Sequence, residues 1–180
     1  MGSIPFGFLI TKFFLKKDIR KVGSGNIGAT NALRTGNKLI GYSTLILDVA
    51  KAVLTILIVK FYYNELIYLS SLLIFIGHVF PVWLKFKGGK GVSTYLGILF
   101  CLDYTLGIIF IIIWLSVILI SKYSSLSSLI SSFIIPIYLF IFVEESNYYF
   151  YIILFILIFF THRENIKRLK NNTESKIKIY

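Results

Sequence analysis

The sequence predicts an all-α integral membrane protein with about seven transmembrane helices, an outside N-terminus and a cytoplasmic C-terminus. Of its 180 residues, 57% are apolar and 17% are aromatic. A soluble domain of this length could not cover so many apolar residues with a polar surface. The apolar residues fall into separate runs with basic, polar segments between them. The chain is therefore expected to form a single polytopic membrane domain, residues 1–180.

Seven apolar runs predict the helices in order along the chain. Several are shorter than the roughly 20 residues that a perpendicular span needs, so short, bent or partly re-entrant helices are expected. The first run is short and begins at the initiator, so a start codon further upstream would lengthen it. The runs cover residues 4–15, 39–59, 66–83, 91–102, 105–120, 126–143 and 147–161.

The distribution of charge predicts the orientation. With the N-terminus outside, four inward segments carry 16 of the 19 Lys and Arg residues, which is the positive-inside bias of membrane proteins. Joining the fourth and fifth runs across Asp103 would place the basic tail outside, so two separate helices are favoured there. The outward connections at Asp103 and at residues 144–146 are short and acidic. The inward segments are residues 16–38, 84–90, 121–125 and 162–180.

Two glycine-rich motifs on the predicted cytoplasmic side suggest anion binding. GSGNIGATNALR spans residues 23–34 and KFKGGKGVST spans residues 85–94. Glycine lets successive backbone N–H groups converge on an anion, and Arg34 could bind a phosphate with two hydrogen bonds. Lys90 is a good phosphate contact, with Lys85 and Lys87 as weaker candidates. Further side-chain donors are Ser24, Asn26, Thr30 and Asn31.

A third motif, HRENI at residues 162–166, places His162 and Asn165 on one helical face. A neutral imidazole could accept a proton from a hydroxyl, and imidazolium or an amide could hold an oxyanion. A histidine after an apolar run can equally be an interfacial residue, so both interpretations stay open.

Three polar residues within the apolar runs are expected to have supporting roles. Asp48 and Lys51 lie three residues apart in one run, where either charge alone would be costly, so they should neutralise each other or reach polar loops. His78 is expected to line the interior and orient a loop below it.

Missing patterns exclude several function classes. Gly23-x-Gly25-x-x-Gly28 matches a dinucleotide-binding fingerprint, but no buried strand precedes it. The second motif is not a P-loop, because Leu84 and Gly91 stand where glycine and Ser or Thr are required. With two His and one Cys, the chain has no metal-binding signature and no cofactor is expected. The basic residues between apolar runs act as topology signals and anion sites, not as nucleic-acid contacts.

Two other classes share some of these features. An organic-anion transporter would also have several spans, buried charges and cationic loops, although it usually shows helices broken near the midplane and inverted repeats. A non-catalytic membrane assembly factor would explain the topology but not the glycine-rich loops.

The motifs together resemble the bacterial acyl-phosphate-dependent glycerol-3-phosphate acyltransferases, the PlsY family. The resemblance runs in order over nearly the whole chain, from Gly2 to Glu174. It implies seven crossings in the bacterial plasma membrane and an active site toward the cytoplasm. It is carried by GSIPFG at 2–7, DIRKVGSGNIGATNALR at 18–34, LDVAK at 47–51, GHVFPVWLKFKGGKGVST at 77–94 and HRENIKRL at 162–169.

The resemblance also implies a reaction and a set of site residues. A fatty acyl group would pass from acyl phosphate to the 1-hydroxyl of glycerol 3-phosphate, giving lysophosphatidic acid and phosphate, the first acylation of phospholipid synthesis. A soluble acyl-phosphate-producing enzyme is a conceivable partner on the basic face. The implied catalytic residues are Ser24, Arg34, Lys90, His162 and Asn165. Implied substrate contacts are these five with Gly23, Gly25, Asn26, Asn31, Lys87, Gly88, Gly89 and Gly91.

Overall fold

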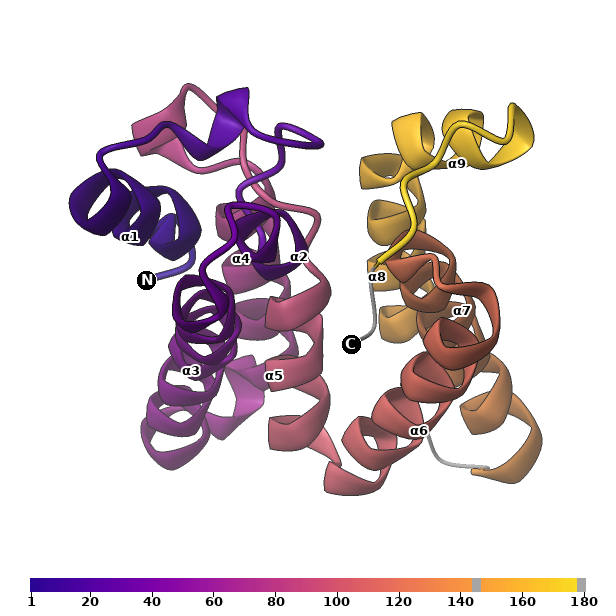
Figure 1. Ribbon diagram of the computed structural model, residues 1–180. Helices are drawn as coiled ribbons and strands as arrows, with labels where there is room; N and C mark the ends of the chain where they lie inside the picture. Colours follow the sequence, from indigo (N-terminus) through magenta and orange to yellow (C-terminus); the bar gives the residue numbers. More distant parts are fainter. Residues whose placement is uncertain (144–146, 178–180) are drawn as a thin grey trace. The chain divides into compact units, whose positions relative to one another are not determined.

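The computed structural model describes residues 1–143 and 147–177, and the predicted acidic connection at 144–146 lies outside them. Within the described residues every regular element is helical. The chain divides into two compact units, residues 1–102 (unit 1) and 103–180 (unit 2), each of which is described by itself (Figure 1).

Each of the seven predicted runs forms a helix, and short 3₁₀ turns join several of them. Unit 1 contains α1 (Phe6–Leu15), η1 (Ile19–Lys21), α2 (Ala29–Leu33), α3 (Lys38–Tyr62), η2 (Asn64–Leu66), α4 (Ile67–Val79), η3 (Val82–Leu84) and α5 (Val92–Leu102). Unit 2 contains α6 (Tyr104–Ser121), α7 (Ser124–Phe142), α8 (Tyr148–Thr161) and α9 (Arg163–Lys170).

Three segments of the described chain are long and apolar enough to cross a membrane: Asn64–Leu84, Tyr104–Ser121 and Ser124–Phe142. The pair α8 and α9 would make a fourth, with a bend of 61° at the break between them. The helices α1 and α5 are apolar but shorter. Several candidate spans are typical of a multi-pass membrane protein. The number of crossings, seven, and the orientation of the termini stay predictions.

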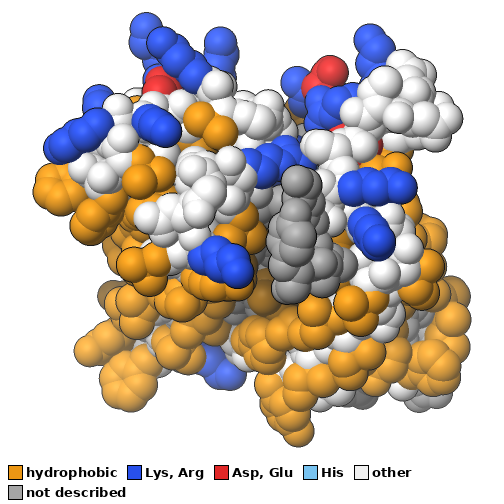
Figure 2. Space-filling model, in the orientation of Figure 1, with side chains coloured by type: hydrophobic (Ala, Val, Ile, Leu, Met, Phe, Trp, Pro, Cys, Tyr) orange, Lys and Arg blue, Asp and Glu red, His pale blue; other side chains and the backbone are white. Residues whose placement is uncertain are grey.

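In unit 1, α3 is the central helix and packs against α1, α2, α4 and α5. Two connections, which we call the first loop (residues 16–37) and the second loop (residues 80–91), lie at the same end of this unit (Figure 1). Lys and Arg side chains gather at that end, whereas hydrophobic side chains cover much of the helical surface below it (Figure 2).

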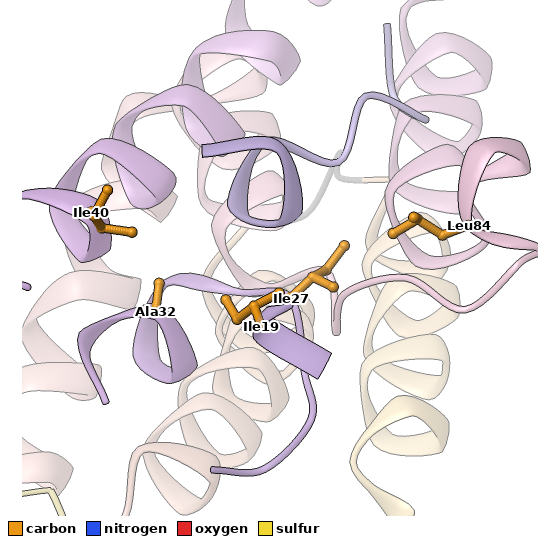
Figure 3. Close-up of a cluster of buried hydrophobic side chains, with 5 residues drawn as sticks. All are labelled: Ile19, Ile27, Ala32, Ile40 and Leu84. Atoms are coloured by element: carbon orange, nitrogen blue, oxygen red, sulfur yellow. The ribbon is translucent and has the colours of Figure 1, made fainter. Parts of the chain in front are cut away.

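A small hydrophobic core lies beneath these two loops (Figure 3). Phe8, Ile10 and Leu15 of the first helical run pack against it. Burying an aliphatic side chain of this size contributes about 1.5–3 kcal/mol. Because the second loop supplies Leu84 to a core built mainly by the first, the two loops are fixed against the same set of side chains. The core consists of Ile19, Ile27, Ala32, Ile40 and Leu84.

In unit 2, α7 packs against both α6 and α8. Three of its buried serines, Ser128, Ser131 and Ser132, donate their hydroxyls to carbonyls of the same helix, as when Ser131 Oγ donates to the Ser127 carbonyl at 2.7 Å. Small residues of this kind let helices approach closely in a membrane. The predicted break before α6 is confirmed, since Asp103 caps this helix by accepting a hydrogen bond of 2.8 Å from the Thr105 amide.

Candidate active site

The first loop is organised by one buried side chain, Asn31. Its Oδ1 accepts the Ser24 amide N–H at 2.9 Å. Its Nδ2 lies 2.8–3.1 Å from the carbonyls of Ile19, Val22 and Asn26. The side chain therefore ties together three turns of the loop, a shaping role that the sequence analysis did not separate from substrate contact.

Gly23 brings Arg34 alongside this network. The glycine has a φ of +51°, in the left-handed region, and a Cβ there would contact Asn31 Oδ1 and lie 2.8 Å from Arg34 Cδ. A larger residue would therefore displace the arginine side chain. The fold brings four predicted site residues of the first loop close together: Gly23, Ser24, Asn31 and Arg34.

An exposed ion pair fixes the start of the first loop. The Arg20 guanidinium donates to both carboxylate oxygens of Asp18, at 2.7–3.2 Å, and the Arg20 amide donates to Asp18 Oδ1 at 3.0 Å. These hydrogen bonds lower the pKa of Asp18 to about 2. Arg20 is thus engaged with a partner in the loop itself.

The second loop is held by its backbone. The Gly88 amide donates to the Val79 carbonyl and the Gly89 amide to the His78 carbonyl, both at 3.1 Å. These two amides cap the C-terminal end of α4 and so do not form the anion nest expected from the sequence. The two glycines are needed for close approach, because a Cβ on either would collide with His78 or its neighbours.

The lysines of the second loop differ in exposure. Lys85 and Lys87 are exposed, whereas Lys90 is half-buried and lies two residues before α5. The start of a helix favours a bound anion. In the first turn of this helix, Thr94 is fully buried, and its hydroxyl has no hydrogen-bond partner among the described residues.

Asp48 and Lys51 neutralise each other, as expected, and the structure adds His78 to the pair. Lys51 Nζ lies 2.8 Å from Asp48 Oδ1, 2.9 Å from His78 Nδ1 and 2.9 Å from the Ile4 carbonyl. All three polar side chains are at most 4% exposed. An ammonium group can only donate, so Nδ1 of His78 accepts and the ring proton lies on Nε2. This edge of the ring faces Gly89, so His78 contacts the loop that it is expected to orient.

In unit 2, His162 lies between α8 and α9 and is 2% exposed. Its Nδ1 is 2.8 Å from the Ile158 carbonyl. A carbonyl oxygen can only accept, so Nδ1 carries a proton. When the ring is neutral, its basic lone pair is therefore on Nε2.

Asn165 is held by a residue that sequence analysis did not assign to the site. Glu174 Oε1 accepts a hydrogen bond of 2.6 Å from Asn165 Nδ2 and one of 2.8 Å from Ser125 Oγ. Arg168 Nε donates to Glu174 Oε2 at 2.7 Å. Burial alone would raise the pKa of Glu174, but the hydrogen bonds from Arg168, Asn165 and Ser125 lower it below its ordinary value.

The predicted site residues thus fall into two groups. Ser24, Arg34 and Lys90 belong to unit 1, and His162 and Asn165 belong to unit 2. Among the described residues, no group of three His, Cys, Asp or Glu side chains could hold a metal ion. The resemblance extends to Glu174, but the sequence did not assign this residue to the site, because its partners lie on α7 and α9 and only the folded tail brings it to them.

Comparison with known proteins gives a consistent result. The sequence model of the glycerol-3-phosphate acyltransferase family matches residues 1–172. A glycerol-3-phosphate acyltransferase of Pelagibacter ubique is 66% identical over 180 residues, which is all of this chain and 94% of the relative. One from Rhodopseudomonas palustris strain HaA2 is 48% identical over 177 residues, covering 98% of this chain and 90% of the relative.

Two solved structures have the same fold. Both are of PlsY (YgiH), described as an integral membrane glycerol 3-phosphate acyltransferase. Its glycerol 3-phosphate form superposes with a TM-score of 0.91 at 36% identity, and its lysophosphatidic acid form with 0.87 at 34%. Each covers 98% of this chain and 90% of the other. From the family match, the relatives and the shared fold, this chain belongs to the glycerol-3-phosphate acyltransferase family and is a multi-pass membrane protein of the PlsY type.

Proposed function

We propose that this protein transfers a fatty acyl group from acyl phosphate to the 1-hydroxyl of glycerol 3-phosphate, giving lysophosphatidic acid and inorganic phosphate. The observation that carries the proposal is the pair of cationic loops on one hydrophobic core in unit 1. Arg34 lies beside Gly23 in one loop and Lys90 precedes α5 in the other. Both substrates carry phosphate, so two cationic sites match their chemistry.

The known PlsY structures support the choice of acceptor and product, since their two forms are named for glycerol 3-phosphate and lysophosphatidic acid. The acyl phosphate donor is our inference from the sequence motifs. An acyl phosphate is a mixed anhydride and is already activated, so the protein needs no covalent acyl intermediate.

The residues take the following roles in the proposal. Arg34 and Lys90 bind phosphate charge, and Ser24 and Asn165 orient glycerol 3-phosphate by hydrogen bonds. His162 binds phosphate or accepts the hydroxyl proton at Nε2, the nitrogen opposite the Ile158 contact. Glu174 accepts one hydrogen bond from the Asn165 amide and so fixes the orientation of that amide. Gly88 and Gly89 shape the second loop through their bonds to α4. The remaining predicted contacts are Gly23, Gly25, Asn26, Asn31, Lys87 and Gly91.

The proposed step balances without a cofactor. The 1-hydroxyl oxygen forms a bond to the acyl carbonyl carbon, and the bond from that carbon to the phosphate oxygen breaks. Phosphate leaves with the electron pair. The hydroxyl proton passes to the phosphate or to His162, and donors at the site stabilise the oxyanion that develops on the carbonyl.

The location of this chemistry is also a proposal. Seven crossings of the bacterial plasma membrane, with the N-terminus outside, would place both loops and the HRENI segment toward the cytoplasm. Glycerol 3-phosphate would reach the site from the aqueous side, while the acyl chain stays in the bilayer. A soluble acyl-phosphate-producing enzyme could deliver the donor on the same basic side.

The test is phosphate release by the purified protein in detergent, supplied with palmitoyl phosphate with and without glycerol 3-phosphate. Palmitoyl coenzyme A serves as the comparison donor. We expect phosphate release that depends on glycerol 3-phosphate and equals the lysophosphatidic acid formed, with no turnover of the thioester.

Matched variants keep the assay specific. Arg34→Ala should abolish turnover, whereas Arg20→Ala, in the same loop but paired with Asp18, should retain most of it. In the second loop, Lys90→Ala should lose more activity than Lys87→Ala. Folded wild-type protein without glycerol-3-phosphate-dependent release would overturn the proposal.

A further inference from the structure

The buried Asp48–Lys51–His78 network lies next to the second loop without being part of it. Lys51 has three ammonium hydrogens and three acceptors close by, from α3, α4 and the N-terminal stretch. Two of these contacts are hydrogen bonds, to the His78 ring and to the Ile4 carbonyl, and the third is the ion pair with Asp48; each is 2.8–2.9 Å long. Such an arrangement has little freedom to shift, so Lys51 determines where the His78 ring lies.

The other edge of the His78 ring determines where the second loop lies. A Cβ built on Gly89 would contact His78 Nε2 and lie 2.8 Å from Cε1 and 3.0 Å from Cδ2. The backbone of Gly89 therefore packs against the Nε2 edge of the ring, and its amide donates to the His78 carbonyl at 3.1 Å. Lys90 follows immediately in sequence. A movement of the ring would change the position of the Gly89–Lys90 peptide directly.

We propose that Asp48, Lys51 and His78 form a positioning unit that sets the Gly88–Gly89 turn and, through it, the affinity for the phosphate of glycerol 3-phosphate. This inference rests on the proposed function. The three residues act through the loop, not on the substrate. Their contribution should therefore appear in the KM for glycerol 3-phosphate more than in kcat.

The first test removes both charges together, because removing one would leave the other buried and unpaired. The Asp48→Leu/Lys51→Met double variant keeps similar side-chain volumes and releases His78 from its partner. We expect the KM for glycerol 3-phosphate to rise at least fivefold, with kcat within twofold and the thermal midpoint within a few degrees of wild type. Folded protein with an unchanged KM would overturn the positioning role.

A second test separates the two edges of the His78 ring. Asn keeps an acceptor close to the Nδ1 position for Lys51 but leaves a gap beside Gly89, whereas Gln carries a polar group close to the Nε2 position. We expect His78→Asn to raise the KM about tenfold and His78→Gln to raise it less. Ser71→Ala is the matched control, because Ser71 is buried on the same helix and donates only within it, to the Ile67 carbonyl.

The third test is compensation, and it remains informative if the charge variants do not fold. Gly89→Ala alone should raise the KM more than tenfold, because the methyl group meets the ring. In the His78→Asn background the methyl group enters the gap, so adding Gly89→Ala should change the KM by less than threefold. Independent effects in the two backgrounds would overturn the proposal.

The wild-type assay distinguishes the two proposals. If the wild-type protein shows no turnover that depends on glycerol 3-phosphate, the proposed function fails. If it is active and the variants keep its KM, only the positioning role fails. Thermal stabilisation by glycerol 3-phosphate alone gives a second readout of affinity, and it should weaken in parallel with the rise in KM.

Discussion

The two glycine-rich loops of unit 1 look alike in sequence but are built by opposite means. The first loop needs a particular side chain, Asn31, whose amide joins four backbone groups. The second loop needs side chains to be absent, because Gly88 and Gly89 rest directly on the end of α4. A glycine-rich motif therefore does not by itself indicate which groups face an anion.

Because of this difference, substitutions should destabilise the two loops for different reasons. Damage to the first loop should depend on lost hydrogen bonds and on backbone conformation, since Gly36, for example, has a φ of +87° and open space around it. The effect of a substitution in the second loop should depend on the volume of the side chain that is added at Gly88 or Gly89. Four substitutions or conditions test this contrast, from the largest expected effect to the smallest.

The largest effect is expected for Asn31→Ala. The substitution leaves the Ser24 amide and three carbonyls without their partner. Because the Asn31 amide has two hydrogens and accepts one bond, about three full hydrogen bonds are lost, and at about 1 kcal/mol each the cost is about 3 kcal/mol. Chemical denaturation of the purified protein measures it. Asn31→Asp should be no less damaging, because an oxygen would then face the three carbonyls. A cost under 1 kcal/mol for both variants would show that the loop does not depend on this amide.

Gly88→Ala should be the next most damaging change. The new Cβ would contact the His78 carbonyl and Pro81 Cδ and would lie 2.5 Å from the Val79 carbonyl oxygen, so backbone must move. Forcing extra volume into a packed site costs about 1–3 kcal/mol. We also expect at least a tenfold loss of glycerol-3-phosphate-dependent turnover. If Gly88→Ala had near-normal stability and activity, added side-chain volume would not be what limits substitution in the second loop.

Gly36→Ala isolates the effect of backbone conformation in the first loop. With no atom within 4 Å of the added Cβ, only the positive φ opposes the substitution, at about 1 kcal/mol. Gly36→Asn should cost less, because asparagine tolerates the left-handed region better. Thermal unfolding of both variants beside Gly88→Ala measures the difference. Equal costs for Gly36→Ala and Gly88→Ala would contradict the distinction between the two loops.

The smallest effect concerns acid. Because the pKa of Asp18 is lowered to about 2, its contribution is complete above the ordinary aspartate value of about 3.9 and is lost as the pH falls through about 2. We expect faster hydrogen exchange of the Arg20 amide in that range, and also in Asp18→Asn at neutral pH. The Gly88 and Gly89 amides, which bond to carbonyls, should not change in Asp18→Asn.

Much of the fold followed from the sequence because its determinants are local. Apolar runs located the helices, and Asp103 marked a helix start that its carboxylate caps. The pairing of Asp48 with Lys51 followed from their spacing on one helix. In each case the interacting groups are only a few residues apart, so periodicity and spacing were sufficient.

The geometry of the candidate site was less predictable because it depends on distant partners. Lys51 and His78 lie on different helices, and the amide of Gly89 is bonded to a carbonyl of α4. Glycine composition alone could not distinguish an anion nest from close packing. Glu174 follows α9 and meets Asn165 only when the tail folds back. Such contacts require the tertiary arrangement of helices.

The hydrogen bond between Asn165 and Glu174 has a consequence for the biogenesis of the protein. Glu174 follows every described helix in the chain, so it leaves the ribosome after all of them. Until the tail docks on Ser125 and Arg168, the Asn165 amide lacks its Glu174 acceptor. A nascent chain stalled before Glu174 would carry every described helix, but its Asn165 amide would lack the Glu174 acceptor. The orientation of the Asn165 amide therefore depends on the docking of the segment that carries Glu174, which is synthesised after every described helix.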